Sequence, residues 1–249
     1  MTYLKTEKEI QIMHEGGKIL SEILKKLSEA VKPGIATNDL EELACELIST
    51  YNAKPSFLGF ENYPSALCTS LNEEIVHGVP SERKLQKGDL LKIDTGILYK
   101  GFHTDSAITI LIQGGENESL KNKLLNTTRE ALQIGIKKAV IGNYLGDIGS
   151  AIQRFAEGRG FNVVRELVGH GIGKALHEWP QIPNYGKAGK GEKLLEGMTL
   201  AIEPMIVTGD WHIKDGQDGF SYKTKDGGLA AHFEHTIAIT REDPLILTR

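Results

Sequence analysis

Apolar residues recur every three or four positions in four segments of the chain, which is the spacing of amphipathic helices. The first segment predicts a helix over 4–31, with a capping box of Thr6 and Glu9 at its start. Pro33 and Gly34 then end this helix. Three further helices are predicted over 38–49, 119–141 and 146–157.

Short β-prone runs follow each pair of predicted helices. The clearest is a hairpin in which 90–99 and 103–111 pair around a turn at Lys100 and Gly101. Other β-prone runs are predicted over 65–80, 162–168, 198–207, 218–224 and 232–240. The glycine-containing segment 184–197 is predicted to be a loop.

The order helix, helix, strands therefore occurs twice, and a weak sequence repeat accompanies it. Residues 30–40 resemble 139–148 with one residue deleted, and both segments span a helix end, a turn and a helix start. Two similar halves would form one pseudo-symmetric α+β domain, 1–249, with a site between them. Any two helix-turn-helix segments share some likeness, so this repeat alone leaves a duplication open.

Composition and charge exclude several classes of protein. Lys and Arg number 29 against 33 Asp and Glu, and this net charge of −4 does not favour nucleic acid binding. Membrane spans and a signal peptide are not expected, because no run of 18 apolar residues occurs and the first 30 residues carry charges throughout. The two cysteines make no disulfide framework, so we expect a cytoplasmic protein. Lysines at 25–26 and 187–193 leave a contact with ribosomal RNA open.

Four carboxylates lie within β-prone runs, where acidic residues are disfavoured. Asp94 and Asp105 fall on the two arms of the predicted hairpin, which can place them side by side. Two carboxylates that close repel each other unless a cation lies between them. Glu203 and Glu234 lie in apolar strands, where an unpaired charge is costly. Any one of these acids, taken alone, also fits a turn or a paired structural residue.

A histidine flanked by glycines completes this set. His170 lies between Gly169 and Gly171, which allow the backbone unusual conformations and close approach. Four carboxylates and one imidazole suit two divalent ions, and the imidazole favours a transition metal over calcium or magnesium. These residues indicate a metal site without selecting a substrate.

Several common enzyme motifs are absent. The chain has no H-E-x-x-H and no G-x-S-x-G, and Glu192 stands where a P-loop requires lysine. The glycines at 169, 171 and 173 lack the spacing of a dinucleotide-binding motif. Zincins, α/β-hydrolases, P-loop NTPases and simple Rossmann enzymes are therefore not expected.

Six segments in combination resemble type I methionine aminopeptidases. They are NEEIVHGVP at 72–80, KIDTG followed by HTDSA at 92–107, VGHGIG at 168–173, LHEWPQIPNY at 176–185, GMTLAIEPM at 197–205 and KTKDGGLAAHFEHT at 223–236. The resemblance covers nearly the whole chain. It implies a pita-bread fold, in which helices cover a curved antiparallel sheet with pseudo-two-fold symmetric halves. It also implies hydrolytic removal of the initiator methionine from nascent proteins, with a small second residue favoured.

The resemblance further implies a set of metal ligands for two divalent ions, of Co, Mn, Fe or Zn. Asp94 would hold one ion, Asp105 and Glu234 would bridge both, and His170 with Glu203 would complete the second ion's ligands. In the family mechanism, a water between the ions becomes hydroxide and attacks the first peptide carbonyl.

Roles for other residues follow from the same resemblance. Glu203 would move the proton from the water to the leaving amine. His177 would bind the substrate carbonyl or its oxyanion, and His77 would contact the scissile amide or the residue after methionine. The methionine pocket would be lined by Phe57, Phe60, Tyr63, Cys68, Leu176 and Phe220. Leu176 and Phe220 replace aromatic residues of some relatives, which changes the pocket's shape rather than the hydrolysis.

The expected partners are nascent polypeptide N-termini, with a ribosome contact left open, no DNA and no membrane, and the chain is expected to be a monomer. Two alternatives remain at this point. Another pita-bread peptidase, of the aminopeptidase P or prolidase kind, would share the five ligands. A non-catalytic relative would bind peptides after losing ligands, whereas all five are present here.

Overall fold

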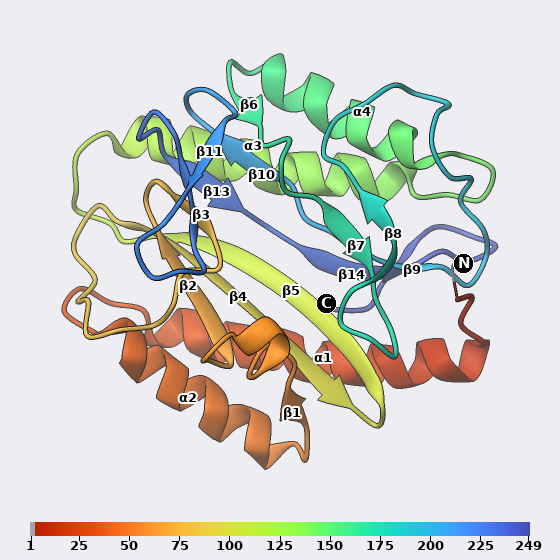
Figure 1. The fold of residues 1–249 in the computed structure, drawn as a ribbon, viewed down its shortest axis with the longest axis horizontal. Coiled ribbons are helices and arrows are strands. Elements are labelled where there is room, and N and C mark those ends of the chain that lie inside the picture. The colour runs from red at the N-terminus through yellow and green to blue at the C-terminus, as the bar shows by residue number, and fades with distance from the viewer. Residues whose placement is uncertain (1–2) are drawn as a thin grey trace.

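The computed structural model describes residues 3–249, and within that range the chain forms four α-helices that cover curved β-sheets from outside (Figure 1). The helices are α1 Glu7–Ala30, α2 Thr37–Thr50, α3 Glu118–Lys138 and α4 Leu145–Glu157, with a 3-10 turn, η1, at Phe60–Asn62. None of these helices is long and apolar enough to cross a membrane, as judged over the described residues.

Antiparallel strands form four sheets. The strands are β1 Lys54–Pro55, β2 Leu67–Leu71, β3 Glu74–Val76, β4 Leu90–Tyr99, β5 Phe102–Leu111, β6 Asn162–Val163, β7 Gly169–Gly171, β8 Glu178–Ile182, β9 Thr199–Ile202, β10 Met205–Val207, β11 Ile213–Asp215, β12 Tyr222–Thr224, β13 Ala230–His232, β14 His235–Ala238 and β15 Leu245–Ile246. One sheet has the order β1-β4-β2 with β5 beside β4, and another has β15-β14-β9-β7-β8. Two smaller sheets, β13-β10-β6 and β11-β12-β3, complete the arrangement.

The predicted start of the first helix was three residues too early. The Thr6 side chain accepts from the N–H of Glu9, and the Glu9 carboxylate accepts from the N–H of Thr6, so the predicted capping box is confirmed. Because the cap fixes the first helical residue, α1 begins at Glu7. The N–H of Lys5 donates to the carbonyl of Gly197 at 2.8 Å, which ties the preceding residues to the other half of the chain.

Two of the predicted strands were too long, and strands β1, β8, β11 and β15 were not predicted. The run 162–168 is extended only at β6, and the next strand, β7, begins at Gly169. The run 218–224 pairs only at β12, because the Asp218 carboxylate accepts from the N–H groups of Phe220 and Ser221 and turns the chain there. Strand β8, which carries Trp179 and Pro180, was not predicted.

The two helical pairs are connected in the same way, which supports the two-half organisation. The N–H of Ala36 donates to Asp39 at the start of α2, and the N–H of Tyr144 donates to Asp147 at the start of α4. Before each of these, a glycine with φ near +90°, Gly34 or Gly142, donates its N–H to a leucine carbonyl. The segments that supply those leucines are 84–94, KLQKGDLLKID, and 193–203, KLLEGMTLAIE. Their likeness was missed at the sequence level and pairs Asp94 with Glu203.

The core is divided between the halves. One apolar cluster joins α1 and α2 to β4 through residues such as Leu24 and Ile93, and another joins α3 and α4 to β9 through residues such as Ile148 and Leu200. A third cluster lies between them and includes Met13 and Leu176. In Figure 1, α1 and α2 lie on one side of the strands and α3 and α4 on the other. The strands between the pairs are therefore where a site can form.

Candidate metal centre

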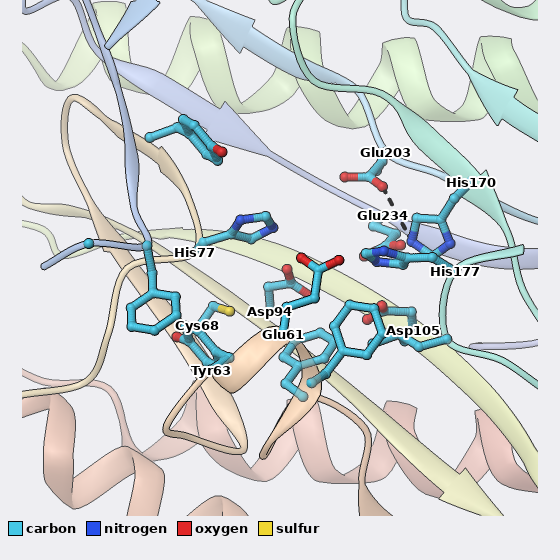
Figure 2. Close-up of a pocket in the computed structure, with 16 residues that line it drawn as sticks. Glu61, Tyr63, Cys68, His77, Asp94, Asp105, His170, His177, Glu203 and Glu234 are labelled. Atoms are coloured by element: carbon cyan, nitrogen blue, oxygen red, sulfur yellow. Dashed lines mark ion pairs between the residues drawn. The ribbon is translucent and has the colours of Figure 1, made fainter. Parts of the chain in front are cut away.

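A cavity of about 330 Å³ opens between the two halves (Figure 2). It is lined by all the residues singled out from the sequence: Phe57, Phe60, Tyr63, Cys68, His77, Asp94, Asp105, His170, Leu176, His177, Glu203, Phe220 and Glu234. Three residues that sequence reasoning missed also line it, namely Glu61, Gly219 and Tyr222. Acidic and imidazole groups gather on one side and apolar groups on the other.

The hairpin presents its two aspartates diagonally across the ladder. Asp94 pairs with Ala107 and Asp105 pairs with Gly96, so the two aspartates are offset by two residues rather than directly opposite. Diagonal neighbours lie on the same face of an antiparallel pair. The sequence correctly predicted that β4 and β5 pair, and the register turns both carboxyl groups to the cavity.

The two glutamates lie at adjoining strand ends in the other sheet. Glu203 directly follows β9 and Glu234 directly precedes β14, and these strands pair with His235 opposite Ile202. Glu234 is also joined to β5, because its N–H donates to the Ala107 carbonyl at 2.9 Å. The hairpin and the five-stranded sheet are thereby held together at the acidic side of the cavity.

The glycines beside His170 allow close approach of the neighbouring strands. A Cβ atom at Gly169 would lie 2.4 Å from the Ala201 carbonyl oxygen, and one at Gly171 would lie 2.4 Å from that of Trp179. His170 Nδ1 lies 2.9 Å from the Gly171 carbonyl oxygen and donates to it. This hydrogen bond leaves Nε2 unprotonated in the neutral ring, with its lone pair available to a metal.

The acidic residues are buried in a way that calls for a cation. Asp94, Asp105 and Glu234 each have a buried carboxyl oxygen without a hydrogen-bond partner among the described residues. Ligand atoms of Asp105, His170 and Glu234 lie within 4.8 Å of one another. Orphaned buried oxygens beside an imidazole lone pair are the donor set of a divalent transition ion, so these residues fit one.

Electrostatics supports the same conclusion. Burial, with repulsion from neighbouring acids, raises the pKa values of Asp94, Glu203 and Glu234 well above their usual range. Burial also raises the pKa of Asp105 to about 7. Burial, with the adjacent His177, lowers the pKa of His170 to about 3, so its ring is neutral. Without a cation, the protein therefore keeps this cluster poorly ionised.

Glu203 is contacted by two imidazoles, one of which was not assigned to the site from sequence. Its Oε1 lies 3.7 Å from His170 Nε2, as the dashed line in Figure 2 marks, and its Oε2 lies 3.3 Å from His232 Nε2. His232 is 1% exposed, and burial lowers its pKa to about 3. Its position two residues before Glu234 was the available signal, and its neutral ring lies against the Glu203 carboxyl, with neither ring nitrogen hydrogen-bonded among the described residues.

The opposite side of the cavity is apolar and aromatic. Phe57, Tyr63 and Leu176 are buried, and the Tyr63 ring meets the Phe220 ring edge to face at 5.3 Å. Cys68 is 3% exposed, and burial raises the pKa of its thiol well above the usual range. The thiol therefore stays neutral and unreactive and acts as a small apolar lining group.

Two histidines stand between the acidic and apolar sides. The His177 ring lies 4.2 Å from that of His170, and Phe60 packs edge-on against it at 4.9 Å. His77 adopts a φ of 60°, uncommon outside glycine, and faces Tyr222 with ring centroids 5.9 Å apart. Burial lowers the pKa of His77 to about 4 and also lowers that of His177. Both rings are therefore neutral near pH 7, when each has one N–H to donate.

The loop that carries His177 is held by a buried ion pair. The Lys5 ammonium bonds the Glu178 carboxylate, whose other oxygen accepts from the N–H of Ala175. Only 2% of the Lys5 side chain and 14% of the Glu178 side chain are exposed. A Cβ at Gly173 would lie 2.3 Å from Lys5 Cε, so the loop closes tightly over the lysine.

Replacing Lys5 by methionine should lower the free energy of unfolding by about 3 kcal/mol, because Glu178 would keep a poorly solvated charge without its partner. Urea denaturation measures this loss. Lys100→Met is the matched control, since the Lys100–Glu15 pair is exposed, and it should leave the free energy of unfolding nearly unchanged. Adding Glu178→Gln to Lys5→Met should recover part of the loss, and no recovery would contradict the ion-pair explanation.

A two-half fold that encloses a buried, unpaired cluster of carboxylates and imidazole beside an apolar pocket defines a metal-dependent hydrolase. Comparison with known proteins gives the family: residues 11–241 match metallopeptidase family M24, and the chain belongs to it. The pita-bread fold predicted from the sequence is thereby confirmed.

Individual relatives agree with this assignment. The chain is 47% identical over 249 residues to the methionine aminopeptidase of Clostridium acetobutylicum, covering 100% of this chain and 99% of the relative. The crystal structure of methionine aminopeptidase from Thermotoga maritima matches with a TM-score of 0.96 and 42% identity over 100% of both chains. Prolidase from Pyrococcus furiosus shares the fold, with a TM-score of 0.79 and 24% identity over 99% of this chain and 65% of that one.

Proposed function

We propose that this chain removes the N-terminal methionine from polypeptides, using two divalent metal ions. The observation that carries the proposal is the cavity between the two halves, in which buried carboxyl oxygens without partners among the described residues face an apolar pocket across two neutral histidines. Similarity over the full chain to methionine aminopeptidases supports it. Nascent chains in the cytoplasm are the proposed substrates, and a monomer is the proposed working form.

The five acidic and imidazole residues would hold the ions. Asp94 would bind one ion, Asp105 and Glu234 would bridge both, and His170 and Glu203 would complete the second. Four carboxylates with one imidazole suit Mn, Fe, Co or Zn. When bound, divalent ions supply a Lewis acid that polarises a peptide carbonyl and lowers the pKa of water.

Glu203 is the proposed proton-transfer group. Its carboxyl directly follows β9 at the cavity and faces the imidazoles of both His170 and His232. It would take the proton from the attacking water and deliver it to the leaving amine. His232, 3.3 Å from its Oε2, would hold the carboxyl in place for both transfers.

The two neutral histidines would bind the peptide around the scissile bond. His177, beside His170, would donate its N–H to the carbonyl oxygen, where negative charge develops during attack. His77, across the opening, would contact the scissile amide or the residue that follows methionine. Neutral rings suit these roles because each offers an N–H without adding a charge to a crowded cavity.

The apolar side would receive the methionine side chain. Its aromatic walls and the Cys68 thiol offer polarizable contacts to a thioether, which packs well against aromatic edges. Phe57, Tyr63 and Leu176 are buried and would form the walls of this pocket. Cleavage one residue from the end follows if the free amine stays at the acidic side.

His177→Ala should keep both metal ions and lower kcat by about 10²–10³, the usual effect of losing one oxyanion donor. The reason is that His177 faces the cavity as a neutral donor, whereas Asp105, His170 and Glu234 supply the clustered ligand atoms. Metal analysis together with steady-state kinetics measures both effects. Loss of metal from this variant would make His177 a ligand and overturn its role.

Turnover of short peptides tests the function directly. Metal-stripped protein should release methionine from Met-Ala-Ser after addition of Mn, Co, Fe or Zn, and should leave Leu-Ala-Ser and the dipeptide Ala-Pro intact. Release only from the methionine peptide, and only with metal, would support the proposal. Hydrolysis of Ala-Pro instead, or metal binding without any hydrolysis, would overturn it.

A further inference from the structure

An acidic residue stands at the opening of the cavity and has no part in the proposed mechanism. Glu61 lies in η1, between the pocket residues Phe60 and Tyr63, and its side chain is exposed. Figure 2 shows its carboxylate projecting into the opening between His77 and His177. Sequence reasoning missed it, because a lone glutamate in a turn carries no catalytic pattern.

The backbone holds Glu61 in an unfavourable conformation. Its φ and ψ are 48° and 32°, and the next residue, Asn62, has a φ of 65°. Left-handed backbone is uncommon for glutamate and costs free energy, whereas asparagine adopts it readily, so the strain of this turn lies at Glu61. The turn directs the Glu61 side chain over the cavity.

Glu61 is also a cavity acid whose negative charge the two proposed metal ions would not balance. Asp94, Asp105, Glu203 and Glu234 are the proposed metal ligands, and two divalent ions would balance their charges. No lysine or arginine lines the cavity, and Glu61 forms no ion pair among residues 3–249. Its negative charge reaches His177, where it opposes the lowering of the pKa that burial causes.

A second carboxylate lies near the opening but is already engaged. Asp218 accepts hydrogen bonds from the N–H groups of Val79, Phe220 and Ser221. Its charge adds to that of Glu61 without competing for a cationic group. The opening therefore carries negative charge, and the Glu61 carboxylate is available to contact a cationic group of a substrate.

We propose that Glu61 selects substrates by charge, favouring peptides with lysine or arginine at the third residue over those with glutamate or aspartate. This inference rests on the proposed function. With methionine in the pocket and the scissile bond at the two histidines, the chain leaves through the opening at about 3.5 Å per residue. Because the favoured second residue is small, the third residue is the first whose side chain is long enough to reach back to the Glu61 carboxylate between the histidines.

The test compares three peptides that differ only in charge, Met-Ala-Lys-amide, Met-Ala-Gln-amide and Met-Ala-Glu-amide. The wild-type enzyme should rank them in that order by kcat/KM, with about three- to tenfold between the ends, as for a solvent-exposed charge pair. Glu61→Gln should bring the three values together, and Glu61→Lys should reverse the order. The wild-type difference should shrink between 0.02 and 0.5 M KCl.

Glu46→Gln is the matched control, because Glu46 is an exposed residue of α2 that does not line the cavity, and the ranking should survive it. Equal wild-type rates on the three peptides would overturn charge selection while leaving methionine removal intact. An equal loss on all three in Glu61→Gln would also overturn it, since Glu61 would then serve the turn. Hydrolysis of none of them by the wild-type enzyme would overturn the proposed function and this inference together.

Discussion

Asp105→Asn should abolish metal binding and peptide hydrolysis together. Asp105 lies centrally in the acidic cluster, within 4.8 Å of the ligand atoms of both His170 and Glu234. Asparagine has nearly the volume of aspartate and should leave β5 intact, but it removes the negative carboxylate that would bind the two ions. Loss of one outer-shell partner costs 10- to 100-fold, so a bridging ligand should cost more than about 10³ in kcat/KM.

Metal content by mass spectrometry after dialysis, and peptide turnover in the same sample, would check this expectation. Asp215→Asn is the matched control, because Asp215 lies exposed on β11 and should leave both quantities unchanged. An unfolding midpoint close to that of the wild-type apoprotein would show that the variant folds. Near-normal metal stoichiometry in Asp105→Asn would remove Asp105 from the ligand set.

The fold was largely predictable because its local signals agree with its tertiary contacts. The capping box at Thr6, the stop at Gly34 and the β4–β5 hairpin each depend on neighbouring residues, so periodicity and turn chemistry suffice. Strand β8 was missed because Pro180 interrupts the β pattern and because its pairing with β7 contains a register shift between His170 and Gly171. The strand predicted over 218–224 was too long because the hydrogen bonds of Asp218 are invisible in an alternation pattern.

The likeness between the two halves extends beyond the repeat on which the sequence prediction was based. The repeat first noticed, 30–40 against 139–148, marks turns that are indeed bonded alike. The stronger likeness, 84–94 against 193–203, places Asp94, within β4, and Glu203, directly after β9, in equivalent positions of the two halves. Recognising it would have brought two of the four acids together from internal symmetry, with no appeal to a family.

The site was predictable in its residues but not in its geometry. All the residues singled out from sequence line one cavity, although they come from strands and loops far apart in the chain. Their contacts could not be derived, because the diagonal register of Asp94 and Asp105 and the imidazole of His232 behind Glu203 depend on sheet packing. Glu61 was missed for a related reason: its position depends on a left-handed turn.

The metal-free protein should lose stability as the pH rises above about 6.5. The folded-state pKa values of Asp94, Glu203 and Glu234 are raised well above their unfolded values, and that of Asp105 is raised from 3.8 to about 7. The folded state therefore holds more protons than the unfolded state, so the free energy of unfolding falls with increasing pH. The free energy of unfolding falls by about 1.4 kcal/mol per pH unit for each carboxyl group that is protonated in the folded state and ionised in the unfolded state.

Other groups limit the pH range in which this effect is clear. Burial lowers the pKa of His170 and His232 to about 3 and that of His77 to about 4, so stability rises with pH until the unfolded histidines lose their protons near 6.5. Burial also lowers the pKa of Lys92 to about 7, which opposes the carboxyl groups by one proton at higher pH. Burial lowers the pKa of Lys5 in the same direction, but between pH 6.5 and 8.5 the four raised carboxyl groups outnumber the two lysines.

Urea denaturation at pH 6.5, 7.5 and 8.5, in chelator and again with excess Mn²⁺, would measure the expected changes. The metal-free curve should fall with pH, while the gain on adding metal should grow, because the ion replaces protons that the carboxyl groups must release. Asp105→Asn should flatten the metal-free slope, since one of the raised carboxyl groups is gone. A metal-free protein whose stability stays level or rises over this range would mean that the cluster ionises without a cation. The physical argument for the metal centre would then fail, independently of any turnover measurement.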